Sequence, residues 1–118
     1  MNSNPFIGAW QLVSGEIAEP GEAIKPYNMN ELQSRKVISA QSFSFVTLLR
    51  GAFYSAASGG YRFDQTSYTE TPALASWGEM NGAEFTFTYR IAGDEWHNER
   101  FNAAGERVEY EIWRRVSA

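Results

Sequence analysis

The chain has 118 residues, of which 43% are hydrophobic and 15% aromatic, and it carries a net charge of −4. A chain of this length is too short for two independent hydrophobic cores, so we expect residues 1–118 to form a single domain. The negative charge and the scattered arginines argue against a nucleic-acid partner. The absence of cysteine excludes disulfides, thiolate metal ligands and a cysteine nucleophile.

The start of the chain lacks the positively charged region and the apolar run of a secretory signal. No apolar stretch approaches the roughly 20 residues that a membrane-spanning helix needs. We therefore expect a cytoplasmic protein with no membrane partner. A mature secreted form, from which a signal has been removed, stays open.

Strand patterns begin near the amino end. Residues 7–17 are rich in apolar and β-branched side chains and predict a long first strand, in which Gly15 suits a bulge or bend. Residues 18–34 contain two prolines and show no regular pattern. Within them, one short helical turn fits residues 29–33.

The middle of the chain predicts four shorter strands. Gly59-Gly60 separates the second from the third, and residues 72–80 are interpreted as a connection. Asn81-Gly82 is a strong tight-turn signal. The four predicted strands cover residues 35–40, 42–49, 61–64 and 67–71.

The clearest alternation in the chain follows this turn. Large apolar residues alternate with polar ones over residues 84–91, which predicts a half-buried strand. Residues 95–101 and 107–116 predict the last two strands, each after a glycine-containing turn. The apolar face of 84–91 carries Phe85, Phe87, Tyr89 and Ile91.

Together these patterns predict about eight strands, spaced roughly ten residues apart and joined by short turns. Such a meander predicts an all-β fold. Closure into a small antiparallel up-and-down β-barrel would remove the two unpaired edges of an open sheet. A barrel of this size is wide enough to be filled by its own side chains or to be hollow, and the sequence leaves that choice open.

Several segments resemble a known family. The opening Gly8-Ala9-Trp10 resembles the Gly-x-Trp start of lipocalins and fatty-acid-binding proteins, the calycin barrels. Four later segments resemble, in order, small bacterial lipocalin-like proteins of unassigned function. These are Gly59-Gly60-Tyr61, Tyr68-Thr69-Glu70-Thr71, Gly93-Asp94-Glu95-Trp96-His97 and Glu111-Ile112-Trp113-Arg114-Arg115.

The resemblance implies a lipocalin-like barrel in which Trp10 closes one end. It also implies that Arg114 or Arg115, on the last strand, lies across the indole ring as a cation–π contact. The chain is shorter than secreted lipocalins and lacks their disulfides, and it has no evident room for the helical lid of fatty-acid-binding proteins. The resemblance therefore does not imply a fatty acid as ligand.

Aromatic residues on the predicted inner faces favour a binding protein that holds a small apolar or amphipathic molecule inside the barrel. Tyr68 and Glu70 share a face of their strand and would fix a polar group of that molecule. The residues expected at the ligand are Phe43, Phe45, Tyr61, Tyr68, Glu70, Phe85, Phe87, Tyr89 and His97.

His97 is the single histidine, and two alternative functional roles are open for it. With Glu99 or Glu70 it would form the acid–base pair of an enzyme, and alone it would serve as an axial haem ligand. No second histidine or cysteine supports a zinc site, and no serine lies in a recognisable nucleophile motif. We expect no metal and no cofactor, and the enzyme stays an alternative.

The third hypothesis is a filled barrel that acts as a protein-interaction or dimerisation module. Trp77 in a connection, and Val13, Val46 and Leu48 on predicted outer faces, suit a homodimer contact. The charged residues of the last strand are interpreted as a solvent-facing surface of weak ion pairs. They are Glu106, Glu109, Glu111, Arg107, Arg114 and Arg115.

Overall fold

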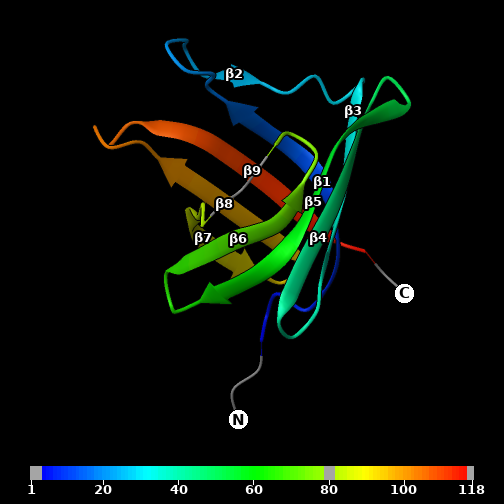
Figure 1. Ribbon diagram of the computed structural model, residues 1–118, viewed down its shortest axis with the longest axis vertical. Coiled ribbons are helices and arrows are strands. Elements are labelled where there is room, and N and C mark those ends of the chain that lie inside the picture. Colours follow the sequence, from blue (N-terminus) through cyan, green and yellow to red (C-terminus); the bar gives the residue numbers. More distant parts are fainter. Residues whose placement is uncertain (1–3, 79–81, 117–118) are drawn as a thin grey trace.

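The computed structural model describes residues 4–78 and 82–116, and these residues form nine β-strands (Figure 1). Eight of them close an antiparallel barrel in the order β1-β3-β4-β5-β6-β7-β8-β9, with β9 returning to β1. The predicted all-β barrel is confirmed. In the described part of the chain, no helix has the length and apolar character to cross a membrane. The strands are β1 (Gly8–Ile17), β2 (Lys25–Pro26), β3 (Leu32–Ile38), β4 (Ser42–Leu49), β5 (Ala52–Phe63), β6 (Ser67–Ala75), β7 (Phe85–Ala92), β8 (Glu95–Phe101) and β9 (Arg107–Arg115).

The short strand β2 lies outside the barrel order. It pairs with the last residues of β1, where Glu16 faces Pro26 and Ile17 faces Lys25. The short helical turn expected at 29–33 is present in shortened form, because residues 29–31 form one hydrogen-bonded turn. Glu31 and Leu32 donate backbone hydrogen bonds to the carbonyl of Asn28, and strand β3 begins at once.

The middle of the chain differs most from the prediction. Gly59-Gly60 does not separate two strands but lies inside the 12-residue strand β5. The register shifts between Ser58 and Gly59, because the missing side chain of Gly59 lets the β6 backbone approach closely. β6 then continues through Pro72 to Ala75, in the segment that was predicted to be a connection. The predicted turn residue Asn81 lies outside the described residues.

Trp10 closes the barrel end from which the chain enters. Its side chain is fully buried and donates a hydrogen bond from Nε1 to the carbonyl of Phe6 at 2.9 Å. The guanidinium of Arg115 lies 4.2 Å from the centre of the indole ring and donates to the carbonyls of Ile7 and Pro5. Of the two arginines that the resemblance allowed, Arg115 therefore makes the cation–π contact.

We expect Arg115→Met to lower the free energy of unfolding by about 1–3 kcal/mol. The change removes a cation–π contact and two charge-assisted hydrogen bonds from a partly buried site. Arg114→Met is the matched control, because Arg114 is exposed, and it should change stability by less than about 0.5 kcal/mol. Urea unfolding of both variants measures this. Equal effects would contradict the assignment.

Large inward-facing side chains fill this closed end. Phe6 packs against Tyr68, with ring centres 4.8 Å apart, and against Trp96 at 5.0 Å. Above Trp96 and Trp113 the packing stops, and the opposite half of the barrel is hollow. The buried core consists of Phe6, Trp10, Leu12, Ile38, Phe43, Ala57, Tyr68, Phe87, Trp96 and Trp113.

Candidate functional site

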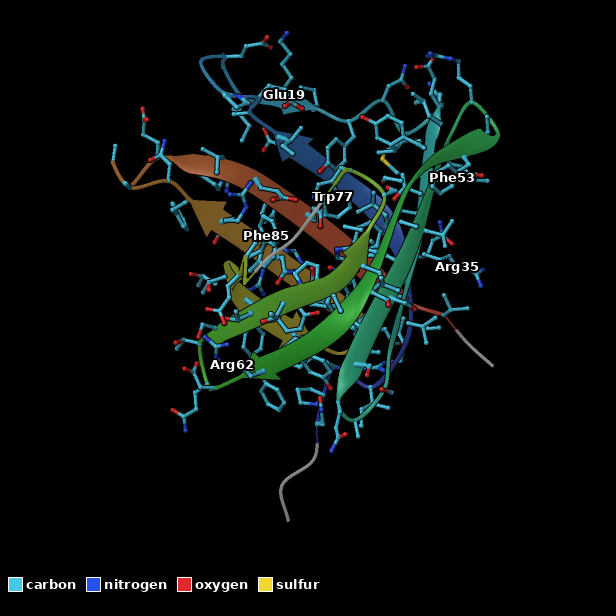
Figure 2. All side chains as sticks on the ribbon, in the orientation of Figure 1. Glu19, Arg35, Phe53, Arg62, Trp77 and Phe85 are labelled. Atoms are coloured by element: carbon cyan, nitrogen blue, oxygen red, sulfur yellow. The ribbon has the colours of Figure 1, made fainter. Side chains whose placement is uncertain are left out.

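A cavity of about 510 Å³ occupies the open half of the barrel. Every barrel strand contributes to its wall, because alternate side chains along each strand point inward. Trp77 and Phe85 lie at this cavity, whereas Arg35 and Phe53 point away from the barrel (Figure 2). The open interior is the first candidate for a binding site.

One side of the cavity, formed by β4, β7 and the segment after β6, is apolar and aromatic. Trp77, from the segment after β6, stacks on Phe45 of β4 with ring centres 5.9 Å apart. Phe85 and Phe87 face them from β7, and Leu12 lies on β1. Trp77 is 47% exposed, so a large ring stands at the mouth, where a ligand must pass.

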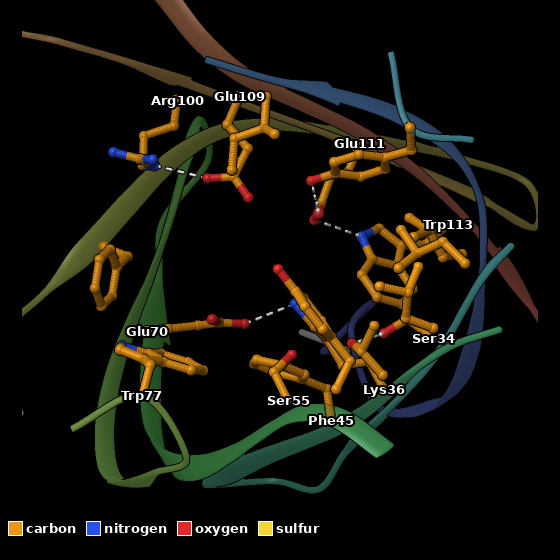
Figure 3. A pocket seen from close by; sticks show the side chains of 18 of the residues that line it. Ser34, Lys36, Phe45, Ser55, Glu70, Trp77, Arg100, Glu109, Glu111 and Trp113 are labelled. Atoms are coloured by element: carbon orange, nitrogen blue, oxygen red, sulfur yellow. Dashed lines mark hydrogen bonds and ion pairs between the residues drawn. The ribbon is translucent and has the colours of Figure 1, made fainter. Parts of the chain in front are cut away.

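A buried ion pair forms the floor. The Nζ atom of Lys36 on β3 lies 2.7 Å from Oε2 of Glu70 on β6, and both residues are buried (Figure 3). The hydroxyl of Tyr68 donates to the same carboxylate oxygen at 2.7 Å. Burial and the Glu70 carboxylate raise the pKa of Tyr68, so this hydroxyl stays a neutral donor.

A second carboxylate, Glu111 on β9, faces the same space (Figure 3). It accepts hydrogen bonds from the Tyr27 hydroxyl at 3.0 Å and from Nε1 of Trp113 at 3.2 Å. Burial, and then repulsion from Glu109, raises the pKa of Glu111 from 4.5 to about 7, although Lys36 acts in the opposite direction. Glu111 therefore changes charge near neutral pH.

The Tyr27 ring can lie next to Glu111 because the β1 residue against which it packs is a glycine, Gly15. A Cβ atom at Gly15 would lie 2.6 Å from the Tyr27 ring and 2.8 Å from the carbonyl oxygen of Tyr110. The backbone N–H of Tyr27 also donates to the carbonyl of Gly15 at 2.8 Å. Gly15 thus serves to seat Tyr27 against the cavity, and the register shift in β1 lies earlier, between Leu12 and Ser14.

We expect Glu111→Gln to flatten the pH dependence of stability. Because folding raises the pKa of Glu111 from 4.5 to about 7, its stabilising contribution is complete below pH 4.5 and is lost as the pH rises through 7. Glu111 is only partly buried, so solvent screening reduces this effect, and the variant should gain roughly 1–3 kcal/mol relative to the wild type between pH 5 and pH 8.

Urea unfolding at pH 5, 6.5 and 8 measures this difference. Glu106→Gln removes an exposed carboxylate in the β8–β9 turn and should follow the wild-type pH curve. Parallel curves for Glu111→Gln and the wild type would show that Glu111 titrates normally in the folded protein.

The structure distributes the nine predicted ligand residues over three places. Phe45, Glu70, Phe85 and Phe87 line the cavity. Four others lie below or beside it: Tyr68 and Phe43 are buried in the core, and Tyr61 and Tyr89 pack against Phe6 at the closed end. The ninth, His97, lies outside the barrel.

His97 faces outward because its neighbours on β8, Trp96 and Asn98, are fully buried on the inner face. Its Nδ1 lies 2.7 Å from the Tyr110 hydroxyl, and its Nε2 lies 3.1 Å from Oε1 of Glu95. The prediction that His97 pairs with Glu99 or Glu70 is therefore wrong.

Glu70 points into the barrel interior, on the other face of the sheet from His97. Glu99 pairs with Arg107 at 2.8 Å. Among the described residues no contact joins His97 to Glu70 or Glu99; the carboxylate that His97 contacts is Glu95, on the outer face.

The interpretation of β9 as carrying its acidic residues outward is also wrong. Glu109 and Glu111 face the cavity, and Glu109 pairs there with Arg100 of β8 at 2.8 Å. The alternation of Val108, Tyr110 and Ile112 resembles a core face, but these residues are only half-buried. One signal was available: if Arg115 must reach Trp10 inside the barrel, Trp113, Glu111 and Glu109 must share its face.

No protein-family model and no curated protein matches this chain. A solved structure, that of an uncharacterized protein from Bacteroides eggerthii DSM 20697, is similar to it with a TM-score of 0.56 and 16% sequence identity. The match covers 94% of this chain and 99% of that chain. At this identity the similarity concerns the fold alone. The chain is thus an eight-stranded antiparallel β-barrel whose architecture recurs, over nearly its whole length, in a protein of uncharacterised function.

Proposed function

We propose that this protein is a lipocalin-like binding protein that holds a small amphipathic molecule in its barrel. The observation that carries the proposal is the cavity of about 510 Å³, with an aromatic side and a polar floor. Small-molecule sites typically enclose about 300–1,000 Å³, with mostly apolar walls and a few placed polar groups.

The distribution of side chains supports one orientation of the proposed ligand. Its apolar body would lie against Phe45, Phe85 and Trp77, where contact removes exposed rings from water. Its polar group would point down toward Glu70 and Glu111, which face the lower cavity (Figure 3).

Neither alternative function gains support from the described residues. A filled barrel requires a packed interior, and the open half is hollow. An enzyme based on His97 requires this residue at the cavity, and it lies on the outer face with Tyr110 and Glu95. Homodimer formation through the outer face stays a prediction; Val46 on that face is 52% exposed.

A neutral fluorescent probe, N-phenyl-1-naphthylamine, tests the proposal. We expect its fluorescence to rise on binding to the wild type. Ser55→Trp places a large ring inside the cavity and should weaken binding at least about tenfold, because the probe loses volume and wall contact. Ser44→Trp introduces the same ring on the exposed face of β4 and should bind like the wild type.

Circular dichroism and urea unfolding establish that both variants fold. Equal probe affinity for Ser55→Trp and the wild type would place binding outside the barrel and reject the proposal. A native mass spectrum of the purified protein would then provide the mass of any retained ligand and the oligomeric state.

A further inference from the structure

The charges that line the cavity are unequal in number. Carboxylates contribute five residues to the wall, and cationic side chains contribute two, Lys36 and Arg100. One of the carboxylates, Glu31, is paired at 3.0 Å with Arg50, which lies outside the lining. Both cations are already paired within the wall, Lys36 with Glu70 at 2.7 Å and Arg100 with Glu109 at 2.8 Å. The carboxylates are Glu19, Glu31, Glu70, Glu109 and Glu111.

Glu111 differs from the paired carboxylates, because its hydrogen bonds come from the neutral donors Tyr27 and Trp113. Each carboxylate oxygen can accept two hydrogen bonds, so Glu111 retains acceptor capacity toward the cavity. Glu109, two residues along the same strand face, adds a second negative charge nearby. A positive group placed between the floor and β9 would relieve this repulsion.

The surrounding rings also favour a cation. The chain's own ammonium at Lys36 lies 4.8 Å from the ring centre of Trp113, 5.1 Å from that of Trp96 and 5.8 Å from that of Phe45. The interior therefore already holds one ammonium by a carboxylate together with aromatic faces. Phe45 and Trp113 also line the cavity, so they are available to a second cation.

We infer that the cavity selects amphipathic amines, with an aromatic or apolar body and a protonated amino group directed at Glu111, over carboxylic acids of the same shape. This inference rests on the proposed function and names its ligand class. A bound carboxylate would have to give up its water shell beside Glu70, Glu109 and Glu111, while Lys36 and Arg100 are engaged by their own partners. An amine instead gains a direct ion pair with Glu111.

Selectivity should depend on pH through Glu111. The ionisable groups around it are Tyr27 before β3, Lys36 on β3, Tyr68 and Glu70 on β6, Arg100 on β8 and Glu109 on β9. Because burial and Glu109 raise the pKa of Glu111 to about 7, it is mostly ionised at pH 8 and mostly neutral at pH 5.5. Amine binding should therefore strengthen as the pH rises.

Three probes with one aromatic body test the inference: 2-(1-naphthyl)ethylamine, 2-(1-naphthyl)ethanol and 1-naphthylacetic acid. Each competes with N-phenyl-1-naphthylamine for the wild-type protein at pH 8 and at pH 5.5. The amine and the acid keep their charges over this range. At pH 8 we expect the amine to bind about tenfold or more tightly than the acid, with a smaller ratio at pH 5.5.

Glu111→Gln should weaken binding of the amine about fivefold or more at pH 8, and it should change binding of the alcohol by a smaller factor, because glutamine keeps a hydrogen-bonding oxygen but has no charge. Glu106→Gln, the exposed control, should bind all three probes like the wild type. Urea unfolding confirms that each variant is folded.

Equal or tighter binding of the acid would overturn the inference, while binding of the alcohol in the same series would leave the proposed function standing. An unchanged amine affinity in Glu111→Gln would also overturn it. A failure of the proposed function would give a different result from a failure of this inference. In that case Ser55→Trp would bind N-phenyl-1-naphthylamine as tightly as the wild type does.

Discussion

Lys36→Met will lower the free energy of unfolding by about 3–5 kcal/mol, because it leaves Glu70 as an uncompensated charge in the interior. Lys36 is 3% exposed and Glu70 is 6% exposed, so water from the cavity would screen little of the charge that the carboxylate keeps. The Tyr68 hydroxyl would remain as a hydrogen-bond donor to the carboxylate. Urea unfolding at pH 7 measures the loss.

Two controls separate the buried charge from the lost side chain. Lys25→Met removes the chain's other lysine, which is 73% exposed, and should change stability by less than about 0.5 kcal/mol. Lys36→Met combined with Glu70→Gln removes both charges and keeps an acceptor for Tyr68. This double variant should return to within about 1 kcal/mol of the wild type. A single variant as stable as the double variant would contradict the assignment.

Gly59→Ala should cost about 3 kcal/mol or more, since the added methyl group meets backbone and not a flexible side chain. A Cβ atom at Gly59 would overlap the carbonyl oxygen of Thr71 and lie 2.7 Å from both the Ala73 nitrogen and the Pro72 Cα. Strands β5 and β6 would have to separate at their bulge. Since β6 carries Glu70, probe binding should weaken as well.

The neighbouring glycine provides the control. A Cβ atom at Gly60 would have the Gln41 carbonyl oxygen as its nearest contact, at 3.8 Å, so Gly60→Ala should cost less than about 1 kcal/mol. Thermal unfolding compares the two variants. Similar melting temperatures would mean that β5 and β6 do not approach at Gly59 as described.

Where one face of a strand is strongly apolar, the local sequence pattern was sufficient to predict which face points into the barrel. The alternation of Phe85, Phe87 and Tyr89 correctly predicted the inner face of β7, and Phe43 and Phe45 did the same for β4. The Gly8-Ala9-Trp10 opening correctly implied a closed end with an arginine on the indole ring. The alternation of apolar residues is local and can be read directly from the chain. The contact of Arg115 with Trp10 joins the two ends of the chain, and it was implied by the family resemblance and not by local pattern.

Of the charged residues in the lower cavity, Glu70 was predicted from the sequence but the others could not be read in this way. Lys36, Glu109 and Glu111 are charged residues on strands, and a charged residue on a strand is usually exposed, so local pattern places them outside. Their inward position follows from the strand register, and a shift of one residue would turn each of them outward.

Local alternation and turn chemistry were thus enough to predict an eight-stranded barrel and its aromatic faces. Closure of β9 on β1 and on β8 placed Trp113 and Glu111 inside and His97 outside. Whether the barrel is filled or hollow depends on how side chains from every strand meet at its centre. That arrangement is set by contacts between residues far apart in the chain. Local periodicity carries no information about such contacts.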